Sequence, residues 1–261
     1  LQLLVAQMAR KPLLEDVAVD TKLVIGPESK KPLDLGIPLF VSAMSFGALS
    51  ANAISALNNG ARIGGFAHDT GEGGISRYHK QGGGDLIWEI GSGYFGCRAA
   101  DGGFDPDKFV ETASNPQVKM IEIKLSQGAK PGKGGILPGV KVTPQIASIR
   151  GIAPGQDSIS PNRHTDVNNI SELLDLVERV RKVTGKPTGF KTVIGAYGWI
   201  ETLLEEVIRR GLDSAPDFIT IDSADGGTGA APMSLMDYMG MPISESLPLV
   251  VDMLEKFQLR E

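Results

Sequence analysis

From Pro38 onwards, short strand-like segments alternate along the chain with segments of helical periodicity. Such alternation is typical of parallel βαβ units, in which each helix packs on the sheet that the strands form. We predict about six strands, centred near Phe40, Phe66, Phe95, Ile121, Lys191 and Ile219. Six strands fit a doubly wound sheet, and two more would complete an eight-stranded barrel. Periodicity alone leaves both architectures open.

Capping residues predict where several helices begin and end. Ser50 precedes the first helical segment, and Asn169 and Gly185 delimit the clearest one. Small polar side chains favour the first position of a helix, and glycine favours the position just after its end. By the same reasoning Ser246 is predicted to cap the last helix.

Two strands are predicted to carry an inward-facing lysine. In residues 118–126, one face carries Ile121, Ile123 and Leu125, and the other carries Met120, Glu122 and Lys124. The apolar face of a barrel strand packs on the outer helices, so Lys124 should point into the barrel, and Lys191 should do the same from its own strand. An ammonium group there needs a carboxylate, a phosphate or an electron-rich cofactor as its partner. Glu122 is the structural alternative, as an ion-pair partner of Lys124.

Three glycine-rich loops follow predicted strands, at residues 68–74, 127–135 and 225–229. Glycine lets the backbone approach a ligand closely, and active sites of barrels gather at the C-terminal ends of the strands. None of the loops matches a Walker loop or a dinucleotide fingerprint. Their shared position therefore favours one active site.

Composition excludes several classes of function. The net charge of −5 gives no basic surface for nucleic acid. The single cysteine, Cys97, permits no internal disulfide and no iron–sulfur cluster held by this chain alone. His68, His79 and His164 lack the spacing of metal ligands, so no metal site is predicted. No apolar run is long enough to span a membrane and no signal peptide is evident, so we expect no membrane partner and a cytoplasmic location.

Five motifs occur in a fixed order: SAMSFGALSANAI, GGFAHDTGEGG, IKLSQGAKPGKGG, DSISP and DGGTGAAP. Together they resemble the FMN-binding synthase domain of glutamate synthase, and more closely the stand-alone glutamate synthase-related FMN-binding proteins. The resemblance covers residues 38–242. It implies an α/β fold of the (β/α)8 TIM-barrel type, here incomplete with about six strands. Residues 1–37 are then an N-terminal extension, and residues 38–261 are a barrel domain truncated before its last two strands.

The resemblance also implies an activity and its residues. Reduced FMN would pass a hydride to a 2-imino acid, made from 2-oxoglutarate and ammonia or from an analogue, and the product would be glutamate or its analogue. The catalytic residues implied are Glu72, Lys124 and Lys130, and the residues implied to bind substrate are Arg150, Lys130 and Ile136. The residues implied to contact FMN are Ser42, Ala43, Met44, Ser45, Lys191, Asp225, Gly226 and Gly227.

Several features depart from the family pattern. Ile136 stands where glutamate synthases carry a substrate-binding glutamine, which puts 2-oxoglutarate itself in question. The FMN phosphate grip is expected in the last two strands, and an iron–sulfur cluster would need residues beyond position 261. Ammonia would come from a separate glutaminase and electrons from a donor subunit. The chain is expected to form a homo-oligomer or to assemble with the missing barrel segment.

Two other functions stay open. The chain could be a non-catalytic barrel fragment or binding module that has lost its flavin. It could also be an FMN-dependent isomerase, which uses the flavin without net oxidation or reduction of its substrate.

Overall fold

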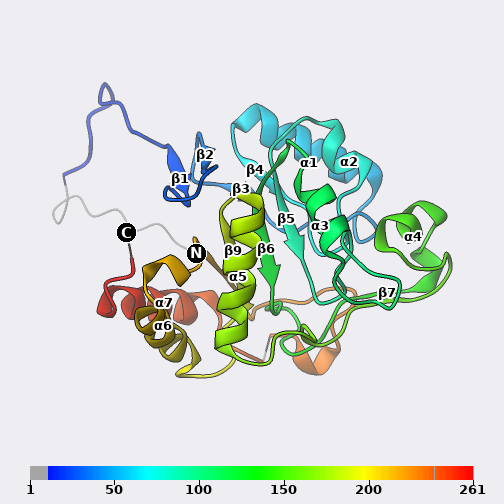
Figure 1. Cartoon of the computed structure of the whole chain (residues 1–261). Coiled ribbons are helices and arrows are strands. Elements are labelled where there is room, and N and C mark those ends of the chain that lie inside the picture. Colours follow the sequence, from blue (N-terminus) through cyan, green and yellow to red (C-terminus); the bar gives the residue numbers. More distant parts are fainter. Residues whose placement is uncertain (1–10, 238, 261) are drawn as a thin grey trace.

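The computed structural model describes residues 11–237 and 239–260, so the first ten residues of the expected N-terminal extension lie outside the described part. Its centre is a six-stranded parallel sheet in the order β10-β9-β6-β5-β4-β3, which forms half of a barrel (Figure 1). This confirms the predicted α/β fold of the barrel type with about six strands. The strands are β3 (Phe40–Val41), β4 (Ala67–Asp69), β5 (Leu86–Ile90), β6 (Val118–Lys124), β9 (Thr188–Val193) and β10 (Ile219–Asp222).

Helices follow most of the strands (Figure 1). They are α1 (Ala51–Gly64), α2 (Arg77–Gln81), α3 (Pro106–Ala113), α4 (Pro144–Arg150), α5 (Ile170–Thr184), α6 (Trp199–Arg210) and α7 (Ile243–Lys256). Two small antiparallel pairs lie outside the main sheet: β1 (Leu23–Ile25) with β2 (Leu33–Leu35), and β7 (Ile136–Leu137) with β8 (Ser158–Ile159). Helices α5 and α6 pack on the outer face of the sheet, whereas α4 lies beside the β7 segment (Figure 1). Among the described residues, no helix is both long and apolar enough to cross a membrane.

One predicted strand was misplaced. The segment around Phe95 is a series of turns, in which the Cys97 amide donates to the Tyr94 carbonyl, and the third strand is β5 instead. Every residue of β5 is buried, including Glu89. An acidic residue in the middle of a buried strand conceals the apolar pattern, and the partner that makes it tolerable lies on β9, about a hundred residues later.

The predicted inward and outward faces of the strands are confirmed. Ile121 packs beside Val180 of α5, and Ile123 and Phe190 pack against the apolar faces of α5 and α6. The opposite faces of β6 and β9 carry Lys124 and Lys191, and both lysines line the same cavity. The barrel interior is therefore polar at this level.

The N-terminal end of the barrel is closed by apolar side chains. Leu33 and Leu35 of β2 pack against Ala67, Ile87 and Met120, which lie near the starts of β4, β5 and β6. The hairpin of β1 and β2 accordingly lies at the N-terminal ends of the strands (Figure 1). This plug leaves the C-terminal ends as the accessible end of the barrel.

The helix boundaries follow the predicted caps with one exception. Ser50 and Asn169 accept hydrogen bonds from the Ala53 and Glu172 amides, and Gly185 ends α5 in the left-handed conformation. The prediction that Ser246 caps α7 is wrong, because the helix begins at Ile243, four residues earlier than predicted, with Pro242 at the cap position. The Ser246 hydroxyl instead donates to the Pro242 carbonyl from inside the first turn.

Candidate functional site

A cavity of about 370 Å³ opens at the C-terminal ends of the strands. The three glycine-rich loops all contribute to it, which confirms their predicted position beyond β4, β6 and β10. Two further segments, the loop after β3 and the β7 strand with its flanking residues, complete the wall. The charged side chains that line it include Glu72, Glu89, Lys124, Lys130, Arg150 and Lys191.

Glu72 is held at the centre of one wall of the cavity. The Lys124 ammonium donates to its Oε2 at 3.2 Å and also to the Gln127 side chain at 3.1 Å. A side-chain carbon at Gly91 would lie 2.9 Å from Glu72 Oε2, and one at Gly135 would overlap Glu72 Oε1. The glycines therefore allow the loops to close tightly around this carboxylate.

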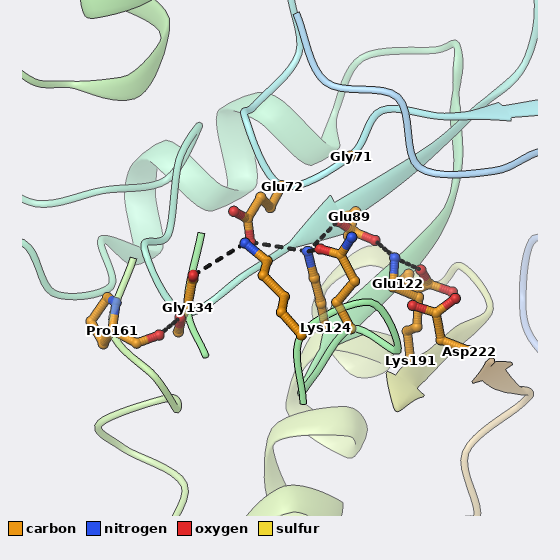
Figure 2. A network of polar contacts seen from close by, with 12 residues as sticks. Gly71, Glu72, Glu89, Glu122, Lys124, Gly134, Pro161, Lys191 and Asp222 are labelled. Atoms are coloured by element: carbon orange, nitrogen blue, oxygen red, sulfur yellow. Dashed lines mark hydrogen bonds and ion pairs between the residues drawn. The ribbon is translucent and has the colours of Figure 1, made fainter. Parts of the chain in front are cut away.

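A chain of alternating charges runs from Glu72 into the barrel (Figure 2). Lys124 lies 3.8 Å from Glu89 Oε1, and Lys191 forms an ion pair with Glu89 Oε2. Lys191 also lies 4.0 Å from Glu122 Oε1. The other carboxylate oxygen of Glu122, Oε2, accepts a 2.5 Å hydrogen bond from the Thr220 hydroxyl. The predicted alternative, an ion pair between Lys124 and Glu122, is wrong. Lys124 forms its ion pairs with Glu72 and Glu89.

Burial and the neighbouring charges set the protonation of this chain. Burial raises the pKa of Glu122 to about 7, and it raises the pKa of Asp69 well above its usual range, with Glu89 and Glu122 adding to that effect. Burial also opposes the charged forms of Glu89 and Lys191. The ion pair outweighs burial, so the pKa of Glu89 is lowered and that of Lys191 is raised. Lys191 is therefore a permanent cation facing the cavity.

Two more cations, Lys130 and Arg150, line the cavity and lie close enough to Glu72 to interact with its charge. The buried Lys130 donates to the Gly134 carbonyl at 3.1 Å, and burial lowers its pKa. The Arg150 guanidinium is also buried and donates to Ser158 Oγ at 3.0 Å and to the Phe46 carbonyl at 3.5 Å. Its Nε has no hydrogen-bond partner among the described residues. These contacts hold the guanidinium at the cavity while leaving donor capacity free.

Most residues implied by the motifs converge on this cavity. Ser42, Ala43, Met44, Ser45, Glu72, Lys124, Lys130, Ile136, Arg150 and Lys191 all line it. Asp225, Gly226 and Gly227 do not, and in the described chain Thr228, Gly229 and Ala230 take that part of the wall. Asp225 instead pairs with Ser223, and the Gly226 amide donates to Asp237.

Two carboxylates at the site were not among the predicted residues. Glu89 lies on the strand that the sequence pattern missed, and Asp222 ends β10, where its carboxylate accepts a 2.8 Å hydrogen bond from the Gly128 amide. Asp222 directly precedes a glycine-rich loop, which is a signal that could have identified it. Glu89 offers no comparable local signal.

Cys97, His68 and His79 are not among the residues that line the cavity. Cys97 is buried, and burial raises the pKa of its thiol to about 12, so it is a packed thiol. His68 and His79 pack against each other on the outer side of β4. In the described part of the chain, the group of side chains able to share a metal ion is Asp69, Glu89 and Glu122, where the Lys191 ammonium already neutralises part of the charge.

Comparison with known proteins shows a single family. The family model described as a conserved region in glutamate synthase matches residues 2–261. The glutamate synthase large subunit-like protein YerD of Bacillus subtilis is 41% identical over 92% of this chain. The archaeal-type glutamate synthase [NADPH] of Thermotoga maritima is 36% identical over 94% of it. The chain spans 46% and 44% of these two relatives, so about half of their length.

Among solved structures, a mandelate oxidase mutant with a monooxide FMN adduct is similar in fold, with a TM-score of 0.50. The matched region covers 94% of this chain and 62% of the mandelate oxidase chain. The sequence identity is 16%, so the likeness concerns the fold.

Proposed function

Because the chain belongs to the family defined by the conserved region of glutamate synthase, we propose that it is the flavin-binding part of an FMN-dependent oxidoreductase. The observation that carries the proposal is the convergence of Lys124, Lys130 and Arg150 around Glu72, in the cavity that Lys191 also enters. Such a cavity suits a dianionic substrate beside a redox cofactor that becomes negatively charged.

The residues present fit the ring end of FMN. The cavity volume lies in the usual range of small-molecule sites, and residues 42–45 line the same cavity as Lys191. Lys191 is the buried cation that would stabilise negative charge on the ring. When bound there, FMN would supply hydride transfer to an imino carbon.

The part of the cavity lined by Glu72, Lys130 and Arg150 is proposed to bind a 2-oxo or 2-imino acid. Arg150 presents a planar guanidinium and Lys130 an ammonium, which together suit two carboxylate groups. Glu72 is proposed to hold or release a proton at its carboxylate, and Lys124 keeps that carboxylate in position. Ile136 also lines the cavity and offers no side-chain hydrogen bond, so we propose a less polar analogue alongside 2-oxoglutarate as substrate.

The source of ammonia and the electron donor are proposed to lie on partner subunits or on other parts of a longer polypeptide. The assembly proposed for the chain is a homo-oligomer or a complex with the rest of a barrel.

The first test is a titration of the chain with FMN, recorded by flavin absorbance. The same titration and a measurement of the flavin midpoint potential are then made on the variant Lys191→Met. We expect the unmodified chain to bind FMN weakly, through the ring end, because the phosphate grip is expected in the two strands that the chain does not contain. We expect the variant to bind FMN with similar affinity and to have a more negative midpoint potential. A shift of at least about 30 mV corresponds to a tenfold weaker preference for the two-electron-reduced state.

The outcomes separate the competing functions. A chain that binds no FMN would be a structural or binding module in this form. An unchanged midpoint potential would remove the role of Lys191. Reoxidation of the reduced flavin by 2-oxoglutarate plus ammonia would support the oxidoreductase, whereas turnover of a substrate without net redox change would favour an isomerase.

A further inference from the structure

Three buried carboxyl groups meet inside the barrel, and one of them, Glu89, also lines the cavity. Asp69 of β4, Glu89 of β5 and Glu122 of β6 each offer an oxygen within 4.8 Å of the other two, and each side chain is at most 1% exposed. We call these three residues the acid core. Lys191 of β9 and Lys124 of β6 lie beside it (Figure 2). Thr220 of β10 donates a hydrogen bond to Glu122.

The charges of the acid core do not balance if every carboxyl group is ionised. Lys191 neutralises Glu89, and the nearest pairing of Lys124 is with Glu72 outside the core. Asp69 and Glu122 are then left as two negative charges in a dry interior, where like charges at this separation cannot both persist.

The hydrogen bonds lead to the same conclusion. Asp69 accepts a 2.8 Å hydrogen bond from the Gly71 amide, and Glu122 accepts one from Thr220. Glu89 Oε1 and Glu122 Oε1 have no donor among the described residues, although both are fully buried. A proton shared within the acid core would supply the missing donor.

We propose that Asp69 and Glu122 form a proton store, which holds at least one proton and takes up another when negative charge arrives at Lys191 and Lys124 in the cavity. The connection is the ion-paired chain of Glu122, Lys191, Glu89 and Lys124, which extends from inside the barrel to Glu72. The directions of the pKa shifts of Asp69 and Glu122 agree with this geometry.

The part of this proposal that concerns FMN rests on the proposed function. Reduction of bound FMN by two electrons from an electrode adds negative charge beside Lys191, and the flavin ring takes its own proton from solvent. One further proton enters the acid core from solvent, and no other group is oxidised or reduced. Asp69 and Glu122 are thus positioning residues that act through Lys191.

The first experiment counts protonated carboxyl groups without any flavin. Infrared difference spectra compare the unmodified chain with Asp69→Asn/Glu122→Gln, which keeps the size of both side chains. We expect a protonated-carboxyl band at neutral pH that the double variant lacks. Asp85→Asn, which changes a partly exposed carboxylate near Lys119, should keep the band. A band that survives in the double variant, or is absent from the unmodified chain, overturns the proposal.

The second experiment measures how the midpoint potential of bound FMN varies with pH. Above about pH 7, where Glu122 is ionised at rest, the unmodified chain should show a steeper dependence than Glu122→Gln. The difference should be about 30 mV per pH unit, the value of one additional proton in a two-electron couple. Equal slopes would overturn the coupling to the cavity. Failure to bind FMN would count against the proposed function, and the infrared result would still decide the proton store.

Discussion

At the scale of single residues, the geometry of Glu72 depends on glycines as much as on its ion pair. Lys124 holds the carboxylate from one side, and the backbone at Gly135 and Gly91 touches it from the other. A side-chain carbon at Gly135 would overlap Glu72 Oε1, so Glu72 could keep its present position only if residue 135 is glycine. The glycine-rich segment thus shapes the catalytic wall directly.

Replacing Gly135 with alanine should move Glu72 away from Lys124. We expect an overpacking cost of about 1–3 kcal/mol, and about tenfold or greater loss of affinity for 2-oxoglutarate in the FMN-loaded chain. Isothermal titration calorimetry measures the affinity, and circular dichroism checks the fold. Gly195→Ala is the matched control, because a side-chain carbon there meets no other atom within 4 Å. Equal affinities in the two variants would contradict the role of Gly135.

At the scale of elements, strand faces and helix limits were predicted correctly from the sequence where they depend on residues close together in the chain. The alternation of β6 predicted the inward direction of Lys124, and capping residues predicted the limits of α5. The sequence could not reveal β5 or Glu89, since the ion pair that stabilises Glu89 forms only after β9 has joined the sheet. The cavity residues were predicted by resemblance between motifs, whereas their hydrogen-bond partners are tertiary and needed the structure.

The short helix α4 should be sensitive to its cap, because it carries Arg150 in its last turn. Thr143 accepts a 3.3 Å hydrogen bond from the Ile146 amide at the start of α4. Thr143→Ala should therefore cost about 1 kcal/mol of helix stability. Hydrogen exchange should show faster opening of α4 in this variant, whereas Thr143→Ser should keep the native rate. Equal exchange in both variants would show that packing alone holds the helix.

At the scale of the whole molecule, titratable groups on the two faces of the sheet should shape the pH dependence of stability. His68 lies on the outer face of β4, and burial, together with the nearby His79, lowers its pKa to about 4. Glu122 lies inside the barrel, and burial raises its pKa to about 7. Their effects on stability have opposite signs.

For His68, the unfolded chain binds a proton near pH 6.5 and the folded chain binds it only near pH 4. Its contribution is therefore complete above about pH 6.5 and is lost as the pH falls towards 4, with a limit on the order of 3 kcal/mol. Urea unfolding from pH 4 to 7.5 should show that His68→Gln loses less stability on acidification than the unmodified chain.

Glu122→Gln serves as the opposite control. The pKa of Glu122 in the folded chain lies above its unfolded value of 4.5. The unmodified chain should therefore lose stability relative to Glu122→Gln as the pH rises from 4.5 to about 7. Parallel stability curves for His68→Gln and the unmodified chain would mean that His68 takes up its proton in the folded state, for example because water reaches the ring.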